Sequence, residues 1–130
     1  MHVMSKTNLY VGNDTGFLHI SNALTAIYLA TGQDTACVAE NSIGHFQIES
    51  VNDGVKFRLT LPSMTIGTVG GGTRLLAQQQ NLKLLGCHEG ENSSKKLAEI
   101  ICASALALET SLLSALASDT FTKAHMKYGR

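Results

Sequence analysis

The sequence predicts an α+β fold in which helices surround a single β-hairpin. Residues 44–61 alternate apolar and polar side chains in two short runs, which is the pattern of paired strands with one apolar face. The segments on either side instead repeat apolar residues every three to four positions, as helices do. The expected order is helix, hairpin, glycine-rich loop, helix, helix and short helix, without the strand–helix alternation of a parallel sheet.

The first predicted helix spans residues 18–33 and follows a turn-like segment at residues 11–16. Leu24, Ile27 and Tyr28 have the spacing of one apolar helical face. Gly32 marks the expected end of this helix, since glycine is common just after a helix terminus.

The predicted hairpin turns at Asn52-Asp53-Gly54, a sequence that tolerates positive φ. The apolar positions of its two runs are Phe46, Ile48, Val55, Phe57, Leu59 and Leu61. Two strands are marginal by themselves, so the apolar face needs a helix of this chain or strands from elsewhere.

The second half of the chain is predicted to be helical after the glycine-rich segment 67–73, which suits neither an ordinary helix nor a strand. Helices are expected at residues 74–86 and at about residues 94–117, and a last one is expected to run to His125. Asn92 or Ser93 is the expected cap of the long helix, and Ser118 or Asp119 that of the last.

Small residues on the long predicted helix indicate close packing against another helix or a sheet. They are Ala103, Ser104, Ala107 and Ser111.

Composition limits the function classes. A chain of 130 residues with 44% hydrophobic residues is sufficient for one compact domain. Ten basic and ten acidic residues give a net charge of zero, which argues against a nucleic-acid binder.

The three cysteines, Cys37, Cys87 and Cys102, form no CxxC pair, so we expect reduced, buried thiols rather than disulfides or a metal site. The start of the chain lacks the apolar core of a signal peptide, and no stretch is expected to span a membrane. These features together predict a soluble cytoplasmic protein.

The glycine cluster Gly67–Thr73 is the first feature that could carry chemistry. Successive glycines let the backbone approach a ligand closely, and amides near a helix start favour anions. The cluster matches neither a Walker loop nor GxGxxG. Both a ligand-binding loop and a tight connection remain open on spacing alone.

Asp34 and His125 are the other candidates. An acid just after a helix end is most often a solvated cap or turn residue. A histidine near a terminus is most often exposed and inert, although it can deliver a proton near neutral pH.

Three motifs together resemble the last third of the catalytic domain of 3-hydroxy-3-methylglutaryl-coenzyme A (HMG-CoA) reductases. They are LTAIYLATGQD at residues 24–34, LPSMTIGTVGGGT at residues 61–73 and KAHMKYGR at residues 123–130. The similarity covers nearly the whole chain from about Leu18 and is nearer to the class with the eukaryotic and biosynthetic enzymes. We therefore expect residues 1–130 to be a C-terminal portion of such a domain, with residues 1–17 a poorly matched lead-in.

The resemblance implies an NADPH-dependent oxidoreductase of the mevalonate pathway of isoprenoid biosynthesis, which reduces HMG-CoA to mevalonate and free coenzyme A without a metal. It implies catalytic roles for Asp34, in a proton network, and for His125, which would protonate the departing thiolate. It further implies substrate-binding roles for His19 and Asn22, and cofactor-binding roles for a second set of residues. That set is Gly70, Gly71, Gly72 and Arg130.

The chain departs from the family at Ala124, where many members have a serine before the catalytic histidine. The family's catalytic glutamate and lysine and its DAMGMN-type cofactor motif lie upstream of TGQD and do not occur in these residues. Catalytic groups that act as a unit do not work piecemeal, so we expect the isolated chain to be inactive. The alternatives are a non-enzymatic remnant that binds coenzyme A or NADPH, and one half of a split enzyme that works as a homo-oligomer or with a missing N-terminal half.

Overall fold

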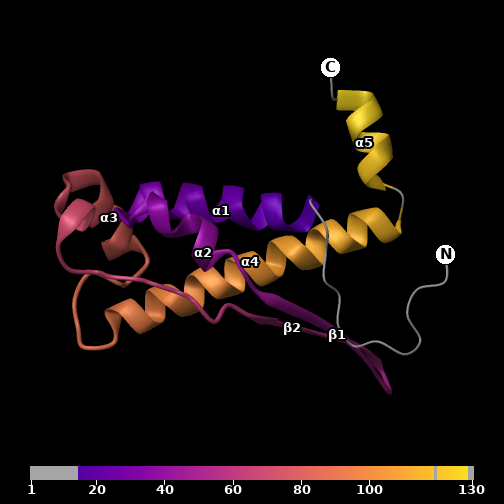
Figure 1. Cartoon of the computed structure of the whole chain (residues 1–130), viewed down its shortest axis with the longest axis horizontal. Helices are drawn as coiled ribbons and strands as arrows, with labels where there is room; N and C mark the ends of the chain where they lie inside the picture. The colour runs from indigo at the N-terminus through magenta and orange to yellow at the C-terminus, as the bar shows by residue number, and fades with distance from the viewer. Residues whose placement is uncertain (1–14, 119, 129–130) are drawn as a thin grey trace.

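A computed structural model of the protein describes residues 15–118 and 120–128 (Figure 1). It is a mixed α+β structure, as predicted. Its elements are α1 (Thr15–Thr31), a 3₁₀ turn η1 (Thr35–Cys37), α2 (Val38–Asn41), β1 (His45–Val51), β2 (Gly54–Thr60), a 3₁₀ turn η2 (Gly71–Arg74), α3 (Leu76–Leu84), α4 (Ser93–Ala117) and α5 (Thr120–Tyr128).

Helix α4 is the centre of the arrangement. It packs against α1 on one side and against strand β2 on the other, while α3 contacts α1 and α5 contacts α4 (Figure 1). The apolar residues in contact repeat every four positions along each helix. Side chains at this spacing form a ridge, and such ridges commonly interdigitate where helices pack. In α1 the row is Ile20, Leu24 and Tyr28, and in α4 it is Leu97, Ile101 and Ala105.

The core is completed by Val38 of α2, Leu82 of α3 and Cys87 after α3. Ile27 is partly buried against it, so the apolar face predicted for α1 is confirmed.

The hairpin is antiparallel, with Phe46 opposite Leu59 and Ile48 opposite Phe57. The Phe46 and Phe57 rings lie on this same face with centroids 5.9 Å apart. Phe46 is buried, whereas Val55 next to the turn is 55% exposed. The predicted alternation is therefore confirmed, and α4 covers the base of the apolar face but not its tip.

The hairpin turn and the start of α1 differ from the sequence prediction, and α3 is shorter and α5 longer than predicted. Val51 pairs with Gly54, so the turn consists of Asn52 and Asp53 alone, and Gly54 begins β2 without a positive φ. Helix α1 begins at Thr15, inside the segment predicted to be a turn. A glycine such as Gly16 costs only about 1 kcal/mol in a helix, which the packing of α1 can offset.

The short helices η1 and α2 were not predicted. They are too brief to show a period, and the signal that precedes them is local. The Asp34 carboxylate accepts a hydrogen bond from the Ala36 backbone N–H at 2.9 Å and so caps η1. An Asp just ahead of a short helical turn is a typical helix-start signal and would have identified this turn.

Helix α4 begins where predicted, after Asn92, but the Asn92 side chain makes no capping hydrogen bond. Ala103, Ala107 and Ser111 are exposed, so the prediction that they pack closely is wrong within the described residues. The described elements that pack on α4 leave these three positions uncovered.

The expectation that no stretch could span a membrane is also wrong by length and composition alone. Helix α4 has 25 residues, and an 18-residue window within it has a mean hydropathy of 1.8. Only 17% of the residues in that window are buried. Its apolar positions are interrupted only by a few charged residues, and its packing against α1 and β2 is typical of a core helix as well.

Candidate functional site

The site is built at the C-terminal end of α1. Gly32 has φ of 73°, and the Gln33 backbone N–H donates to the Tyr28 carbonyl at 2.9 Å. This is the closing bond of a Schellman motif, which needs a residue without a Cβ at its left-handed position. The glycine predicted to end the helix therefore does so by a defined geometry.

Every one of the last four carbonyls of α1 has a partner, although a helix leaves these groups without intrahelical donors. Tyr28 O accepts from the Gln33 backbone. Leu29 O accepts from the Gln78 amide at 3.1 Å and Ala30 O from the Asn81 amide at 2.8 Å. Thr31 O accepts from the Gln33 amide at 3.2 Å. Side chains of α3 thus fix the direction in which the chain leaves α1.

The glycine loop crosses this exit at van der Waals distance. A Cβ on Gly32 would lie 2.4 Å from the Gly72 carbonyl carbon and oxygen, and a Cβ on Gly72 would lie 2.9 Å from Gly32 O. Only two glycines let the two backbones approach this closely. The loop is held further by the Thr68 and Ser93 hydroxyls, 2.7 Å apart, and by a Thr73 hydroxyl bond to Gly70 O.

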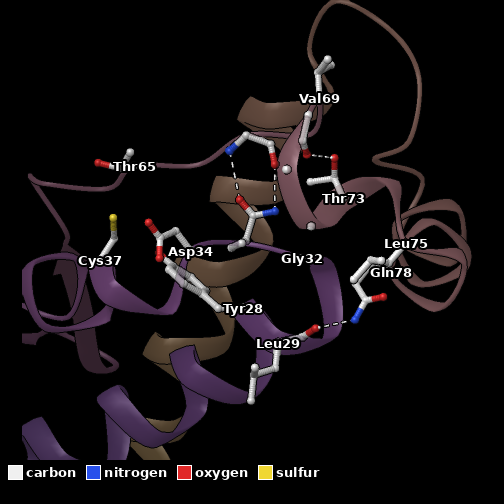
Figure 2. A pocket seen from close by; sticks show the side chains of 15 residues that line it. Tyr28, Leu29, Gly32, Asp34, Cys37, Thr65, Val69, Thr73, Leu75 and Gln78 are labelled. Atoms are coloured by element: carbon white, nitrogen blue, oxygen red, sulfur yellow. Dashed lines mark hydrogen bonds between the residues drawn. The ribbon is translucent and has the colours of Figure 1, made fainter.

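An open pocket of about 610 Å³ lies between the α1 exit and the loop (Figure 2). Its lining residues come from three segments that are distant in sequence. They are Tyr28, Leu29, Gly32, Gln33, Asp34 and Cys37 from the α1 exit, Thr65, Gly67 and Val69–Thr73 from the loop, and Leu75 and Gln78 at the start of α3.

Asp34 is exposed at this pocket. Its carboxylate caps η1, and it forms no ion pair with any residue in the ranges 15–118 and 120–128. The cap orients the side chain while leaving part of the carboxylate free for another group. The cap interpretation from sequence is therefore confirmed, and it is compatible with a site at the same residue.

A buried polar group lies beneath the pocket. The Asn41 amide donates to the Tyr28 hydroxyl at 2.6 Å and to Thr65 O at 3.3 Å, and that hydroxyl donates to the Met64 sulfur at 3.5 Å. Burial raises the pKa of the Tyr28 phenol, outweighing the opposing effect of its hydrogen bond from Asn41. Tyr28 is therefore a neutral, fixed wall of the pocket near neutral pH.

The other wall of the pocket is backbone. Gly70 and Gly71 have φ of 88° and 52°, and a Cβ on either would meet nothing within 4 Å. Val69 beside them is 87% exposed. The loop therefore offers bare peptide groups and one apolar side chain to whatever enters the pocket.

The structure brings together some of the residues predicted to form the site. Asp34, Gly70, Gly71 and Gly72 line one pocket. Asn22 is exposed on α1 and is not part of the lining. It lies nine positions before Thr31, which is about 13 Å along the helix axis.

The remaining predicted residues lie wholly or partly outside the described residues. Arg130 falls beyond them. His19 lies in α1 and His125 in α5, but their side chains are not among those described. Helix α5 is at the end of α4 opposite α3 and the glycine loop (Figure 1). The 25 residues of α4 span about 37 Å, so the backbone of His125 is far from Asp34 of the same chain.

Sequence reasoning missed Gln33. The residue was noted only as a letter of the TGQD motif and was given no role. An amide side chain between a helix-ending glycine and an exposed acid was the available signal.

The three cysteines are free, as predicted, but only Cys87 is buried, whereas Cys37 and Cys102 are half-buried. In the described part of the chain, no group of three or more His, Cys, Asp or Glu residues could hold a metal ion.

Comparison with known proteins places the sequence in a family. The family model for hydroxymethylglutaryl-coenzyme A reductase matches residues 1–130. The chain is 49% identical over 121 residues to the 3-hydroxy-3-methylglutaryl-coenzyme A reductase of Methanocaldococcus jannaschii, an alignment that covers 92% of this chain. It is 46% identical over 116 residues to the Aeropyrum pernix reductase and 47% identical over 119 residues to reductase 2 of Hevea brasiliensis, covering 86% of this chain in each case.

The chain belongs to the hydroxymethylglutaryl-coenzyme A reductase family. It spans 30% of the Methanocaldococcus relative, 28% of the Aeropyrum relative and 57% of the Hevea relative. It therefore matches one part of a longer enzyme.

Proposed function

We propose that this chain supplies one part of an active site that reduces HMG-CoA to mevalonate and coenzyme A, and that it does not turn over alone. The observation that supports this proposal best is the pocket in which Asp34 faces Gly70–Gly72. The overall reaction consumes two hydrides and two protons and releases a thiol, so it requires placed proton donors as well as a nucleotide cofactor.

The glycine loop suits the nicotinamide cofactor that the family implies. Gly70 and Gly71 leave open space where side chains would stand, so a flat ring can lie directly on the backbone. NADPH supplies the hydrides when it is bound. The contribution of the chain is to present Gly70–Gly72 at the wall, to keep Asp34 oriented through its bond from Ala36, and to hold the loop fixed through Thr68.

Asp34 has the role of a proton relay in this proposal. A carboxylate with one oxygen held by a backbone N–H can still accept a proton or an ammonium group on its other oxygen. The lysine and glutamate that the family pairs with this residue are absent from the sequence. Within these 130 residues a developing oxyanion therefore lacks that cationic partner.

His125 has the role of the acid that protonates the coenzyme A thiolate. The length of α4 separates its backbone from the pocket, so Asp34 and His125 of one chain would serve different sites or a site shared between chains. This separation supports either a homo-oligomer or complementation by an N-terminal half. Asn22, His19 and Arg130 are proposed to contact substrate or cofactor in such an assembly.

NADPH oxidation in the presence of HMG-CoA tests the proposal. The purified chain should give no turnover. Mixing it with the upstream part of the Methanocaldococcus reductase, about two thirds of that protein, should restore turnover. Asp34→Asn and His125→Gln should each abolish the restored activity, whereas Asp53→Asn in the hairpin turn should not. Steady turnover by the isolated chain, or no turnover in the mixture, would contradict the proposal.

A second candidate function is favoured by the pocket itself, which exists without any partner. The chain would then be a remnant that binds NADPH or coenzyme A without catalysis. Titration calorimetry with each ligand tests this, with Gly67→Leu to fill the pocket without a strained φ and Gly54→Leu as the matched control. Absence of heat with both ligands would exclude the remnant.

We also propose a cytoplasmic location, which the three free thiols and balanced charge support. Fractionation of cells that express the chain tests it. Recovery in the membrane pellet after a high-salt wash would contradict it and would point to α4.

A further inference from the structure

We infer that Gln33 is a positioning residue, which sets the placement of the glycine loop beside Asp34. The relevance of this inference to catalysis rests on the proposed function, but the geometry behind it does not.

The Gln33 side chain matches both polar groups of one loop residue. Its amide oxygen accepts from the Gly67 backbone N–H at 3.0 Å, and its amide nitrogen donates to the Gly67 carbonyl at 2.8 Å. The same nitrogen donates to Thr31 O at 3.2 Å, at the end of α1. One side chain therefore replaces a pair of strand-like backbone hydrogen bonds between segments that are 34 residues apart.

The loop between Gly67 and Gly72 contacts the α1 exit at both of its ends. At Gly72 the contact with Gly32 is steric, so it limits how closely the loop can approach but does not hold it there. At Gly67 the contact is attractive and comes from Gln33. The Thr68 hydroxyl is hydrogen-bonded to Ser93 of α4, and this bond connects the loop to α4 and not to the α1 exit. Among the described side chains, Gln33 is thus the one that draws the loop towards the α1 exit.

The restraint matters because the loop itself is permissive. Gly70 and Gly71 adopt positive φ, and no atom lies within 4 Å of the place a Cβ would take on either. Asp34 follows Gln33 directly, so the residue that holds the loop also fixes the backbone of the acid. A shift at Gly67 would change the distance between the carboxylate and the loop, which is the quantity that a shared ligand would sense.

The chemistry requires an amide of this length. Asparagine is one methylene shorter and could not reach Gly67 from the same backbone. Gln33→Glu keeps the acceptor but loses the donor, and it places a carboxylate against the carbonyls of Gly67 and Thr31. Protonation of that new carboxyl would restore one donor and one acceptor in the original arrangement. The carbonyls should raise its pKa above the ordinary glutamate value of about 4.3.

Amide hydrogen exchange at Gly67, followed by NMR on the full chain, tests the inference. We compare wild type, Gln33→Glu, Gln33→Asn and the matched control Gln80→Glu, which changes an exposed glutamine on α3. At neutral pH both Gln33 variants should lower the Gly67 protection factor about tenfold, whereas the amides of Leu97 and Ile101 should keep theirs. Lowering the pH to about 5 should restore protection in Gln33→Glu but not in Gln33→Asn.

Unchanged Gly67 protection in both variants would overturn the inference. So would an equal loss at Leu97 and Ile101, which would mean that Gln33 stabilises the whole fold, and so would a Gln33→Glu variant without recovery at low pH. Failure of the NADPH assay in the mixture would instead contradict the proposed function and leave the exchange result standing.

Discussion

The close crossing of Gly32 and Gly72 makes Gly32→Ala a sharp test of the site geometry. The new Cβ would lie 2.4 Å from the Gly72 carbonyl carbon and 2.6 Å from the Thr73 nitrogen, both backbone atoms that cannot rotate away. It would also occupy a residue with φ of 73°. The left-handed conformation costs an L-residue about 1–2 kcal/mol, and overpacking costs about 1–3 kcal/mol. We therefore expect a loss of about 2–5 kcal/mol in the free energy of unfolding.

Three other glycines separate the two contributions. Gly71 has a positive φ and open space, so Gly71→Ala should lose only the conformational part, about 1–2 kcal/mol. Gly72 has the contact without the positive φ, so Gly72→Ala should lose only the steric part, about 1–3 kcal/mol. Gly54 has neither feature, and Gly54→Ala should change stability by less than about 0.5 kcal/mol.

Urea denaturation of the four variants, followed by circular dichroism, measures these differences. A common m-value is required for the comparison. If Gly32→Ala were no more destabilising than Gly71→Ala, the two backbones would not cross this closely, and the described geometry of the pocket would be refuted.

Further predictions concern the core and the buried polar group. Leu82→Ala removes a fully buried side chain and should cost about 2–5 kcal/mol in urea, whereas Leu84→Ala, at an 86% exposed position, should cost little. Tyr28→Phe leaves the Asn41 amide with only Thr65 O and should cost about 1–3 kcal/mol. Burial raises the pKa of Tyr28 above its ordinary value of 10.0. The contribution of Tyr28 to the free energy of unfolding is therefore complete below about pH 10, and it is lost as the pH rises through the folded-state pKa. Thermal melts should show that the stability of Tyr28→Phe falls less at alkaline pH than that of the wild type. An equal fall in both proteins would exclude Tyr28 as its source.

The sequence was informative wherever the physical cause is local. The alternation around Phe46 and Phe57 defined the hairpin, and the spacing of Leu24 and Tyr28 defined the face of α1. Gly32 was identified as a helix end because a left-handed residue there favours glycine over any other side chain. Asp34 as a cap was likewise within reach of local reasoning.

The site itself depended on contacts between distant segments, which local patterns do not encode. The approach of Gly72 to Gly32 and the bond from Gln33 to Gly67 join residues that are 40 and 34 positions apart. The distance between Asp34 and His125 follows from the direction of α4, which no periodicity specifies. The roles of these two residues came from resemblance to a family, and they remain predictions.

The contact between Gly32 and Gly72 also closes a loop of the chain without a covalent bond. Residues 33–71 leave and return at one point, and the entire hairpin lies within this loop. Loop-closure entropy grows only with the logarithm of length, by about 0.6 kcal/mol for each doubling. Residues inserted at Asn52-Asp53 should therefore be absorbed at the exposed tip, about 20 residues from either end, without displacing the pocket. The hairpin can therefore change in length, whereas Gly32 and Gly72, which enclose it, cannot be replaced without loss of stability.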